Sequence, residues 1–209
     1  MTSPSAAVPV VPPRSRGRRQ RSAGTREAIA EAMRELLLTR RLDEVTVAEI
    51  TELAQVSRQT FYAHFETKYS VVAALVEEMG RSILTAWTPF FEGSGPILHA
   101  ELEALGVETL ARWREQATLY SATIEGWHND QEIHDVWNVV LEQFALALAD
   151  RVSTVREPRP GDDVLFPALI STYERSVYLA VSAPESPFGR SDTELAGVLA
   201  QIWMSSLGL

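Results

Sequence analysis

The chain has 209 residues, a hydrophobic content of 45%, a charged content of 22% and a formal net charge of −9, a composition typical of a globular protein that can bury a substantial core. No cysteine is present, which excludes disulfides and thiolate metal sites. No apolar run is long enough to cross a membrane, and residues 1–13 lack the basic start of a secretory signal, so we expect a cytoplasmic protein without membrane contact.

The charges are distributed unevenly along the chain. Residues 1–70 contain 11 Lys and Arg against 8 Asp and Glu, a balance of +3, whereas residues 71–209 contain 8 against 20, a balance of −12. A basic N-terminal third beside an acidic remainder favours a nucleic-acid partner for the first part of the chain.

The first 21 residues are predicted to be a disordered, Arg-rich arm. Residues 1–13 are small and rich in proline, and residues 14–21 contain five arginines. Such an arm can follow the phosphates or the minor groove of DNA, with Arg18 and Arg19 as the candidate contacts. The alternative is a terminus that only improves solubility.

Residues 25–39 form the first amphipathic pattern, in which Ile29, Met33 and Leu37 share one helical face. Residues 45–68 then predict two short helices joined by a tight turn. Thr46 and Glu49 have the spacing of a capping box, and Ser57 is a second N-cap candidate. No glycine stands in the turn, where Gln55 or Val56 lies, and Gln55 adopts a positive φ less readily than glycine or asparagine.

Opposite the apolar Phe61 and Phe65, this second short helix carries hydrogen-bond donors and no carboxylate before Glu66. Arg58 and Gln59 lie in its first turn, where a recognition helix presents side chains to base edges. Tyr62, His64 and Lys68 suit phosphate oxygens. The alternative is a solvated helical hairpin. The full set of candidate DNA contacts in this region is Thr46, Ser57, Arg58, Gln59, Thr60, Tyr62, His64 and Lys68.

The remainder of the chain has helical periodicity and no strand pattern, so the fold class is predicted to be all-α. Pro89 and residues 93–96 end the first long helix, and residues 158–161 are another break. The predicted helices are 67–87, 97–118, 119–127, 131–155, 162–181 and 191–207.

The motif S-R-Q-T-F-Y-A-H-F-E-T-K at residues 57–68 resembles the helix-turn-helix signature of TetR-type transcriptional repressors, with Thr60, Phe61, Tyr62, Phe65 and Lys68 at the signature positions. The resemblance implies a nine-helix TetR-like fold. It implies a DNA-binding domain at 22–68 and a ligand-binding and dimerisation domain at 69–209. It also implies a homodimer that binds palindromic operator DNA and pairs through Asp162–Val181 and Ser191–Leu207. The apolar faces offered for that pairing are Leu165, Ala168, Leu169 and Thr172 on one helix, and Leu195, Leu199, Ile202 and Ser206 on the other.

Large aromatic side chains gather on the apolar faces of several later helices, which indicates either plain packing or a ligand cleft. H-D-V-W at 134–137, Y-E-R at 173–175 and Q-I-W-M-S-S at 201–206 are similar to the ethionamide-resistance repressor group of this family. That similarity implies a tunnel for an elongated hydrophobic ligand. Its polar specificity should differ, because Tyr173 and Ile170 replace asparagines of that group. The implied lining residues are Thr109, Trp113, Trp137, Leu141, Phe144, Tyr173, Tyr178 and Trp203.

The sequence therefore predicts a ligand-responsive regulator that uses no cofactor and no metal and is not an enzyme. The four histidines form no H-E-x-x-H motif, and Gly93-Ser94-Gly95 is no nucleophile elbow. The alternative is a DNA-binding protein of the same fold without a small-molecule inducer.

Overall fold

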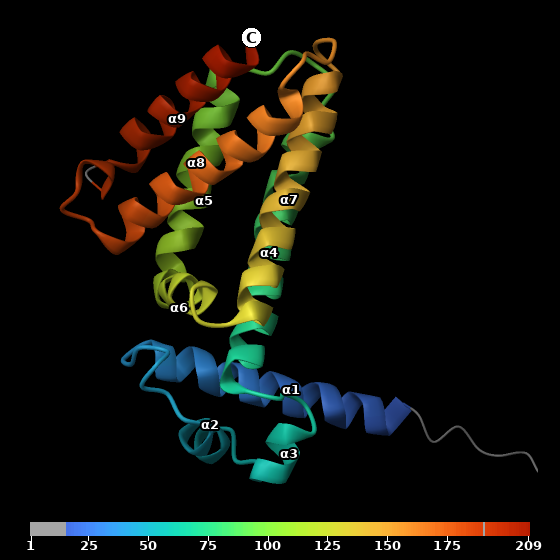
Figure 1. Ribbon diagram of the computed structural model, residues 1–209, viewed down its shortest axis with the longest axis vertical. Helices are drawn as coiled ribbons and strands as arrows, with labels where there is room; N and C mark the ends of the chain where they lie inside the picture. Colours follow the sequence, from blue (N-terminus) through green and yellow to red (C-terminus); the bar gives the residue numbers. More distant parts are fainter. Residues whose placement is uncertain (1–15, 190) are drawn as a thin grey trace, which may run out of the picture.

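The computed structural model describes residues 16–189 and 191–209, with side chains from residue 22 onward. This part of the chain is helical and contains no strand, which confirms the predicted fold class, and none of its helices is long and apolar enough to span a membrane. The helices (Figure 1) are α1 (Arg16–Leu37), α2 (Val47–Leu53), α3 (Arg58–Tyr62), α4 (Lys68–Phe91), α5 (His99–Glu115), α6 (Ala117–Trp127), α7 (Gln131–Ser153), α8 (Asp162–Ser182) and α9 (Asp192–Leu207), with a 3-10 turn at Pro187–Gly189.

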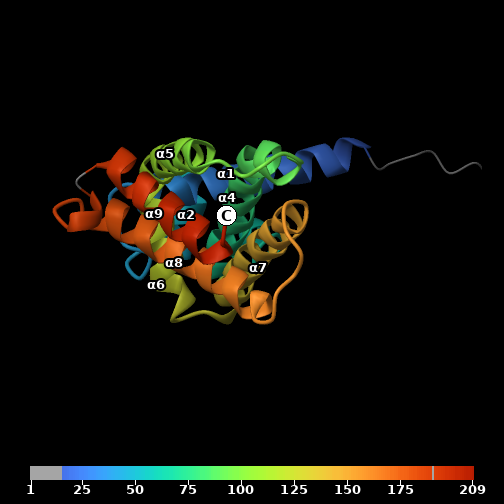
Figure 2. The same ribbon diagram turned by 90° about the horizontal axis from the view of Figure 1, so that it is seen from above.

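The helices form a small lower unit and a larger upper one. Helices α1, α2 and α3 make the lower unit, and α4 rises from it into the upper unit, where it packs along α7 (Figure 1). Figure 2 shows the upper unit from above, with α9 lying against α5 and α7 at the other edge. The exposed tips of α2 and α3 are thus at the far end of the molecule from α8 and α9.

Helix α4 is the central element of the core. Eleven of its residues are buried, because α1 packs against its first turns and α7 against its later ones. Gly80 allows the close approach of α7, since a Cβ at this position would lie 2.8 Å from Cγ1 of Val140. A single apolar cluster therefore runs from Ile29 of α1 along α4 to Leu207 of α9.

Two predicted helix boundaries are wrong. Helix α1 begins at Arg16, not Thr25, so residues 16–21 are helical rather than part of a disordered arm. Arginine and glutamine favour helix, and isolated glycines are tolerated within one. Residues 1–15 lie outside the described residues. Helix α4 runs past Pro89 to Phe91. The proline lacks the N–H that would donate to the carbonyl four residues earlier, but the buried side chains of Trp87 and Phe90 hold this turn against the core.

The predicted pairing faces of α8 and α9 are partly wrong as well. Leu169, Leu195 and Leu199 are buried inside the subunit, because α9 packs against α5 and α8 packs against α7. The large apolar residues that these two helices expose are Val164, Val198 and Ile202. Ala168, Thr172 and Ser206 of the predicted faces are exposed as well.

Arg156 joins the start of α8 to the end of α9. Its guanidinium donates two hydrogen bonds to the Asp162 carboxylate, at 2.8 and 2.7 Å, and its Nε donates to the carbonyl of Leu207 at 3.0 Å. The Arg156 hydrogen bonds, followed by that from the Arg159 backbone, lower the pKa of Asp162 to about 2. The carboxylate is therefore bound more favourably in the folded protein than in the unfolded chain.

We predict that Asp162→Asn lowers the melting temperature at neutral pH, because the two charge-assisted hydrogen bonds from Arg156 are lost. The folded pKa lies below the unfolded value of about 3.9, so the contribution is present above about pH 4 and is lost as the pH falls towards 2. Calorimetry should show the difference from wild type shrinking between about pH 4 and about pH 2. Asp163→Asn, an exposed neighbour in the same helical turn, is the control. An equal, pH-independent loss in both variants would contradict the prediction.

Candidate nucleic-acid interface and aromatic cavity

Helix α2 begins with local hydrogen bonds that the sequence predicts, and the turn to α3 follows at its end. The Thr46 hydroxyl accepts from the Glu49 backbone amide at 3.3 Å, and the Glu49 carboxylate accepts from the Thr46 amide at 2.9 Å, which confirms the capping box. Gln55 has a φ of 54°, the only positive φ outside glycine among the described residues. Gln55 stands in the turn that lacks a glycine, and a left-handed conformation costs a non-glycine residue about 1 kcal/mol.

Apolar side chains on the inner side of α3 and just beyond its end fix its orientation. Phe61 and Phe65 are buried, and the Arg26 guanidinium lies 4.3 Å from the centre of the Phe65 ring while donating to the carbonyl of His64 at 3.2 Å. Ser57 accepts from the Thr60 amide at 3.0 Å and begins the helix. These contacts fix which face of α3 points outward.

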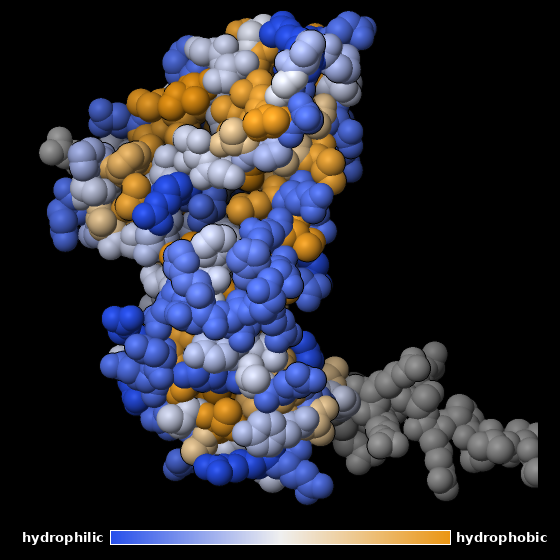
Figure 3. Space-filling view, viewed as in Figure 1, coloured by the Kyte–Doolittle hydropathy of each residue, from blue (hydrophilic) through white to orange (hydrophobic). Residues whose placement is uncertain are grey.

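The outward face of α3 consists of Arg58, Gln59 and Tyr62. All three are exposed, Tyr62 to 57%. In the described part of the chain, the Arg58 and Gln59 side chains form no hydrogen bond or ion pair. Thr60 and His64 are half-buried, while Thr46 and Ser57 are exposed with their hydroxyls engaged in caps. Figure 3 shows hydrophilic residues at this lower end, with some hydrophobic residues among them. The side chains of Arg18 and Arg19 lie outside the described residues.

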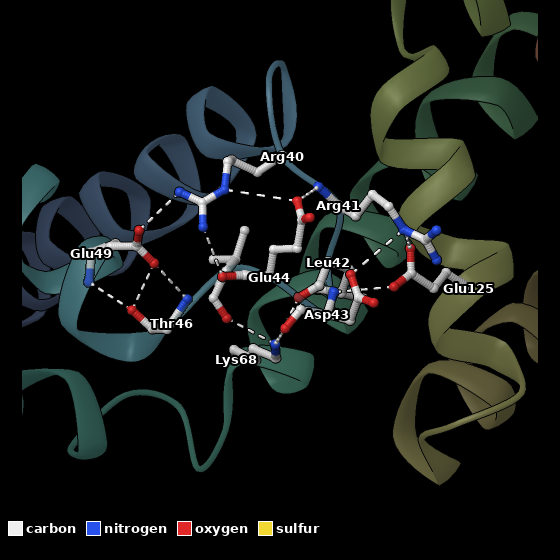
Figure 4. A network of polar contacts seen from close by, with 10 residues as sticks. Arg40, Arg41, Leu42, Asp43, Glu44, Thr46, Glu49, Lys68 and Glu125 are labelled. Atoms are coloured by element: carbon white, nitrogen blue, oxygen red, sulfur yellow. Dashed lines mark hydrogen bonds and ion pairs between the residues drawn. The ribbon is translucent and has the colours of Figure 1, made fainter.

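Lys68 has a different role from the phosphate contact predicted for it. Its ammonium donates to the carbonyls of Leu42, Asp43 and Val45 at 2.6, 3.0 and 2.8 Å (Figure 4). An ammonium has three hydrogens, so all of them are used, and burial lowers the pKa of Lys68. The side chain holds the loop before α2 against the first turn of α4. No sequence spacing indicates this contact, because the partners are backbone carbonyls of a distant loop.

The same loop is also tied to α6. The Glu125 carboxylate accepts from the Asp43 amide at 3.1 Å and lies 3.7 Å from Nε of Arg41, as Figure 4 shows. Arg40 in turn donates to Glu49 of α2 at 3.0 Å. The lower unit is therefore attached to the upper one both through α4 and through the end of α6.

A narrow cavity of about 40 Å³ lies in the upper unit between α4, α5, α7, α8 and α9. Seven of the eight residues that were expected to line a ligand tunnel line this cavity. Tyr178 does not, because it packs edge-on against Tyr120 behind the wall, with ring centres 5.5 Å apart. The volume holds only a few water molecules at most, whereas drug-sized ligands occupy pockets of roughly 300–1,000 Å³. The lining residues are Ile83, Trp87, Thr109, Trp113, Trp137, Val140, Leu141, Phe144, Ile170, Tyr173, Glu174 and Trp203.

Two aromatic groups fill the space. The upper group surrounds Trp87, whose Nε1 donates to the Thr109 hydroxyl at 2.8 Å and whose ring centre lies 5.8 Å from those of Tyr173 and Trp203 and 6.2 Å from that of Phe144. Trp87 is not among the predicted lining residues, because it stands at the end of the predicted helix 67–87. It lies four residues after Ile83, a spacing that places both side chains on one helical face.

The lower group surrounds Tyr120, whose ring centre lies 3.9 Å from Trp113 and 5.8 Å from Trp137. The Tyr120 hydroxyl donates to the carboxylate of Glu174 and also to the Glu174 carbonyl at 3.1 Å. Burial raises the pKa of both side chains. The Tyr173 hydroxyl is buried without a hydrogen-bond partner among the described residues. Polar groups are thus few in this cavity, and one of them is acidic.

Comparison with known proteins gives a consistent result. Residues 29–75 match the family model described as bacterial regulatory proteins, tetR family. The HTH-type transcriptional regulator EthR of Mycolicibacterium smegmatis is 26% identical over 204 residues, which cover 93% of this chain and 92% of EthR. A tetR-family regulator from Streptomyces coelicolor has a TM-score of 0.68 at 20% identity, covering 87% of this chain and 81% of its own. The fatty acid degradation regulator FadR from Bacillus halodurans has a TM-score of 0.65 at 17% identity, covering 88% and 95%.

A helix-turn-helix unit carried on a helical bundle is an architecture of DNA-binding transcriptional regulators. The chain contains a helix-turn-helix segment that matches the tetR family at residues 29–75, and it is similar to the transcriptional regulator EthR over nearly its whole length.

We predict that Lys68→Met lowers the free energy of unfolding by about 2 kcal/mol, because three carbonyls lose a charged donor. Urea titration measures the change, and Arg41→Met, which removes an exposed cation from the same loop, should cost well under 1 kcal/mol. The salt dependence of DNA binding provides an independent readout. Unchanged stability together with a salt slope reduced by about one would instead assign Lys68 to a phosphate.

Proposed function

We propose that the protein is a repressor that binds a palindromic operator as a homodimer, and that a hydrophobic small molecule in the aromatic cavity releases it from DNA. The observation that carries the proposal is the exposed face of α3. Arg58, Gln59 and Tyr62 project from a helix whose other side is fixed by Phe61 and Phe65. A short rigid helix with uncommitted donors is suited to enter a major groove.

Within this proposal the residues in and around α3 have two roles, contact with bases and contact with phosphates. Arginine pairs with guanine and glutamine with adenine through two hydrogen bonds each, so Arg58 and Gln59 read bases. Tyr62 and His64 contact phosphates, as do the exposed cap residues Thr46 and Ser57, and Thr60 supports the first turn through its hydrogen bond to Ser57. Arg18 and Arg19, at the start of α1, add phosphate contacts. Residues 22–68 form the DNA-binding domain in this assignment, and residues 69–209 bind ligand and dimerise.

Dimerisation is assigned to α8 and α9. The exposed side chains of Val164, Val198 and Ile202 lie on these helices, and Figure 3 shows hydrophobic residues gathered over this part of the upper unit. A two-fold axis there places two copies of α3 on one side of the dimer. Reading helices about 34–36 Å apart then match a palindrome with half-sites one helical turn apart.

Ligand release is a shift between two arrangements of the same contacts. A ligand larger than the cavity of about 40 Å³ must displace aromatic rings, and with them the helices that carry those rings. Helix α4 carries Trp87 at the cavity and Lys68 at the DNA-binding unit. Helix α6 carries Tyr120 at one end and Glu125 at the other. The ligand changes operator affinity only as far as it prefers one arrangement.

The small volume of the cavity favours a second candidate, a regulator of the same fold without an inducer. In that case the rings are simply packed, and no compound bound in the cavity changes operator affinity. The two candidates are separated by measuring operator affinity with and without a compound that binds there.

We predict selective binding to DNA that flanks the gene of this protein, because regulators often act on neighbouring genes. Fluorescence anisotropy should give an affinity at least ~10³-fold above that for a scrambled duplex. Arg58→Ala should cost about 1–3 kcal/mol on the operator and less on the scramble, because a base contact is lost. Arg81→Ala, which removes an exposed arginine of α4, should leave both affinities unchanged. Equal losses on both duplexes would make Arg58 a phosphate contact.

We predict that Ile202→Glu converts the dimer to monomers, because it introduces a charge into the proposed interface. Light scattering after gel filtration measures the mass, and operator binding should weaken together with dimerisation. Val139→Glu, at an apolar residue exposed to 50% on α7, should leave the dimer intact. A dimer that survives Ile202→Glu would move the interface away from α9.

A further inference from the structure

Glu174 is an unusual residue for a cavity that takes only neutral hydrophobic ligands. It lies on α8 among the rings of Trp113, Trp137 and Tyr173. A carboxylate withdrawn from water costs free energy unless hydrogen bonds or an opposite charge compensate it. A neutral apolar ligand provides neither and would bury the carboxylate further.

The contacts of Glu174 within the chain leave it only partly compensated. Its carboxylate accepts the Tyr120 hydroxyl, whereas an ionised carboxylate offers about four acceptor positions. No cation forms an ion pair with it in the described part of the chain; the charge of Arg175 acts on it from a distance and offsets only part of the rise in its pKa that burial causes. The neighbouring Arg175 is exposed, and its guanidinium lies 4.9 Å from the centre of the Tyr178 ring.

The surroundings of Glu174 suit a positive charge. The rings of Trp113, Tyr120 and Trp137 pack against one another next to it, and the faces of aromatic rings attract cations, those of tryptophan most strongly. The Tyr173 hydroxyl, buried in the same cavity without a partner, is a second acceptor. A buried hydroxyl without a hydrogen bond is costly, so it too is a group that a ligand can satisfy.

We propose that the cavity selects hydrophobic amines. The protonated nitrogen binds the Glu174 carboxylate beside the faces of Trp113 and Trp137, and the apolar part displaces rings of the upper group around Trp87. An ammonium supplies up to three donors and the missing positive charge in one group. An alcohol supplies one neutral donor, and a carboxylic acid brings a second negative charge. This inference rests on the proposed ligand-binding function and defines its chemical class.

Three matched probes test the inference: 4-phenylbutylamine, 4-phenylbutan-1-ol and 4-phenylbutanoic acid. They share the same apolar part and differ in one terminal group. Calorimetric titration of the full chain at neutral pH should give an affinity for the amine about tenfold above that for the alcohol, because a charge-assisted hydrogen bond replaces a neutral one. The acid should bind more weakly than the alcohol.

The variants assign the preference to a residue. Glu174→Gln keeps the shape and removes the charge, so the amine should bind no better than the alcohol while alcohol binding persists. Tyr120→Phe removes the internal donor that competes for the carboxylate, so the preference for the amine should persist or increase. Glu142→Gln, on the exposed side of α7, should behave as wild type.

Equal affinity of wild type for amine and alcohol would overturn the inference, as would a preference for the amine that survives Glu174→Gln. Failure of all three probes to bind would overturn it too. Operator binding without any probe is measured on the same preparation and tests the proposed function separately. Operator binding with no preference for the amine rejects only the ligand class. A preference for the amine without operator binding rejects only the regulatory role.

Discussion

The structure depends on α4 belonging to both units at once. This helix has 24 residues, which at 1.5 Å per residue gives a length of about 36 Å. Lys68 fixes its first turn to the lower unit, and its later turns form a wall of the cavity. Helix α4 therefore connects the cavity to the lower unit, although no residue belongs both to the cavity lining and to the outward face of α3.

The features that the sequence predicted correctly are those set by local chemistry. The capping box at Thr46, the cap at Ser57 and the burial of Phe61 and Phe65 follow from spacings of three or four residues. The unusual φ of Gln55 follows from a turn that lacks glycine. The cavity lining was carried by resemblance to a group of known proteins rather than by pattern, because helical periodicity identifies an apolar face but not the faces it meets.

The features that the sequence missed depend on contacts between distant segments. Lys68 has the residue type of a phosphate contact, but its charge is taken by carbonyls more than twenty residues away. In the sequence, the apolar face of Leu195 and Leu199 suits a dimer interface as well as it suits the core. In the structure both residues are buried, and α9 packs against α5. In the sequence Glu174 is more typical of a surface or ion-paired residue than of a buried carboxylate, because Arg175 stands beside it.

Lys68 is the only lysine of the chain. Amine-reactive reagents therefore have one side-chain target in this protein, besides the terminal amino group, and its ammonium is enclosed by three carbonyls. A lysine held in this way reacts only when the loop before α2 separates from α4. The rate of acylation of Lys68 thus reports how often the loop before α2 separates from α4, without any label having to be engineered into the protein.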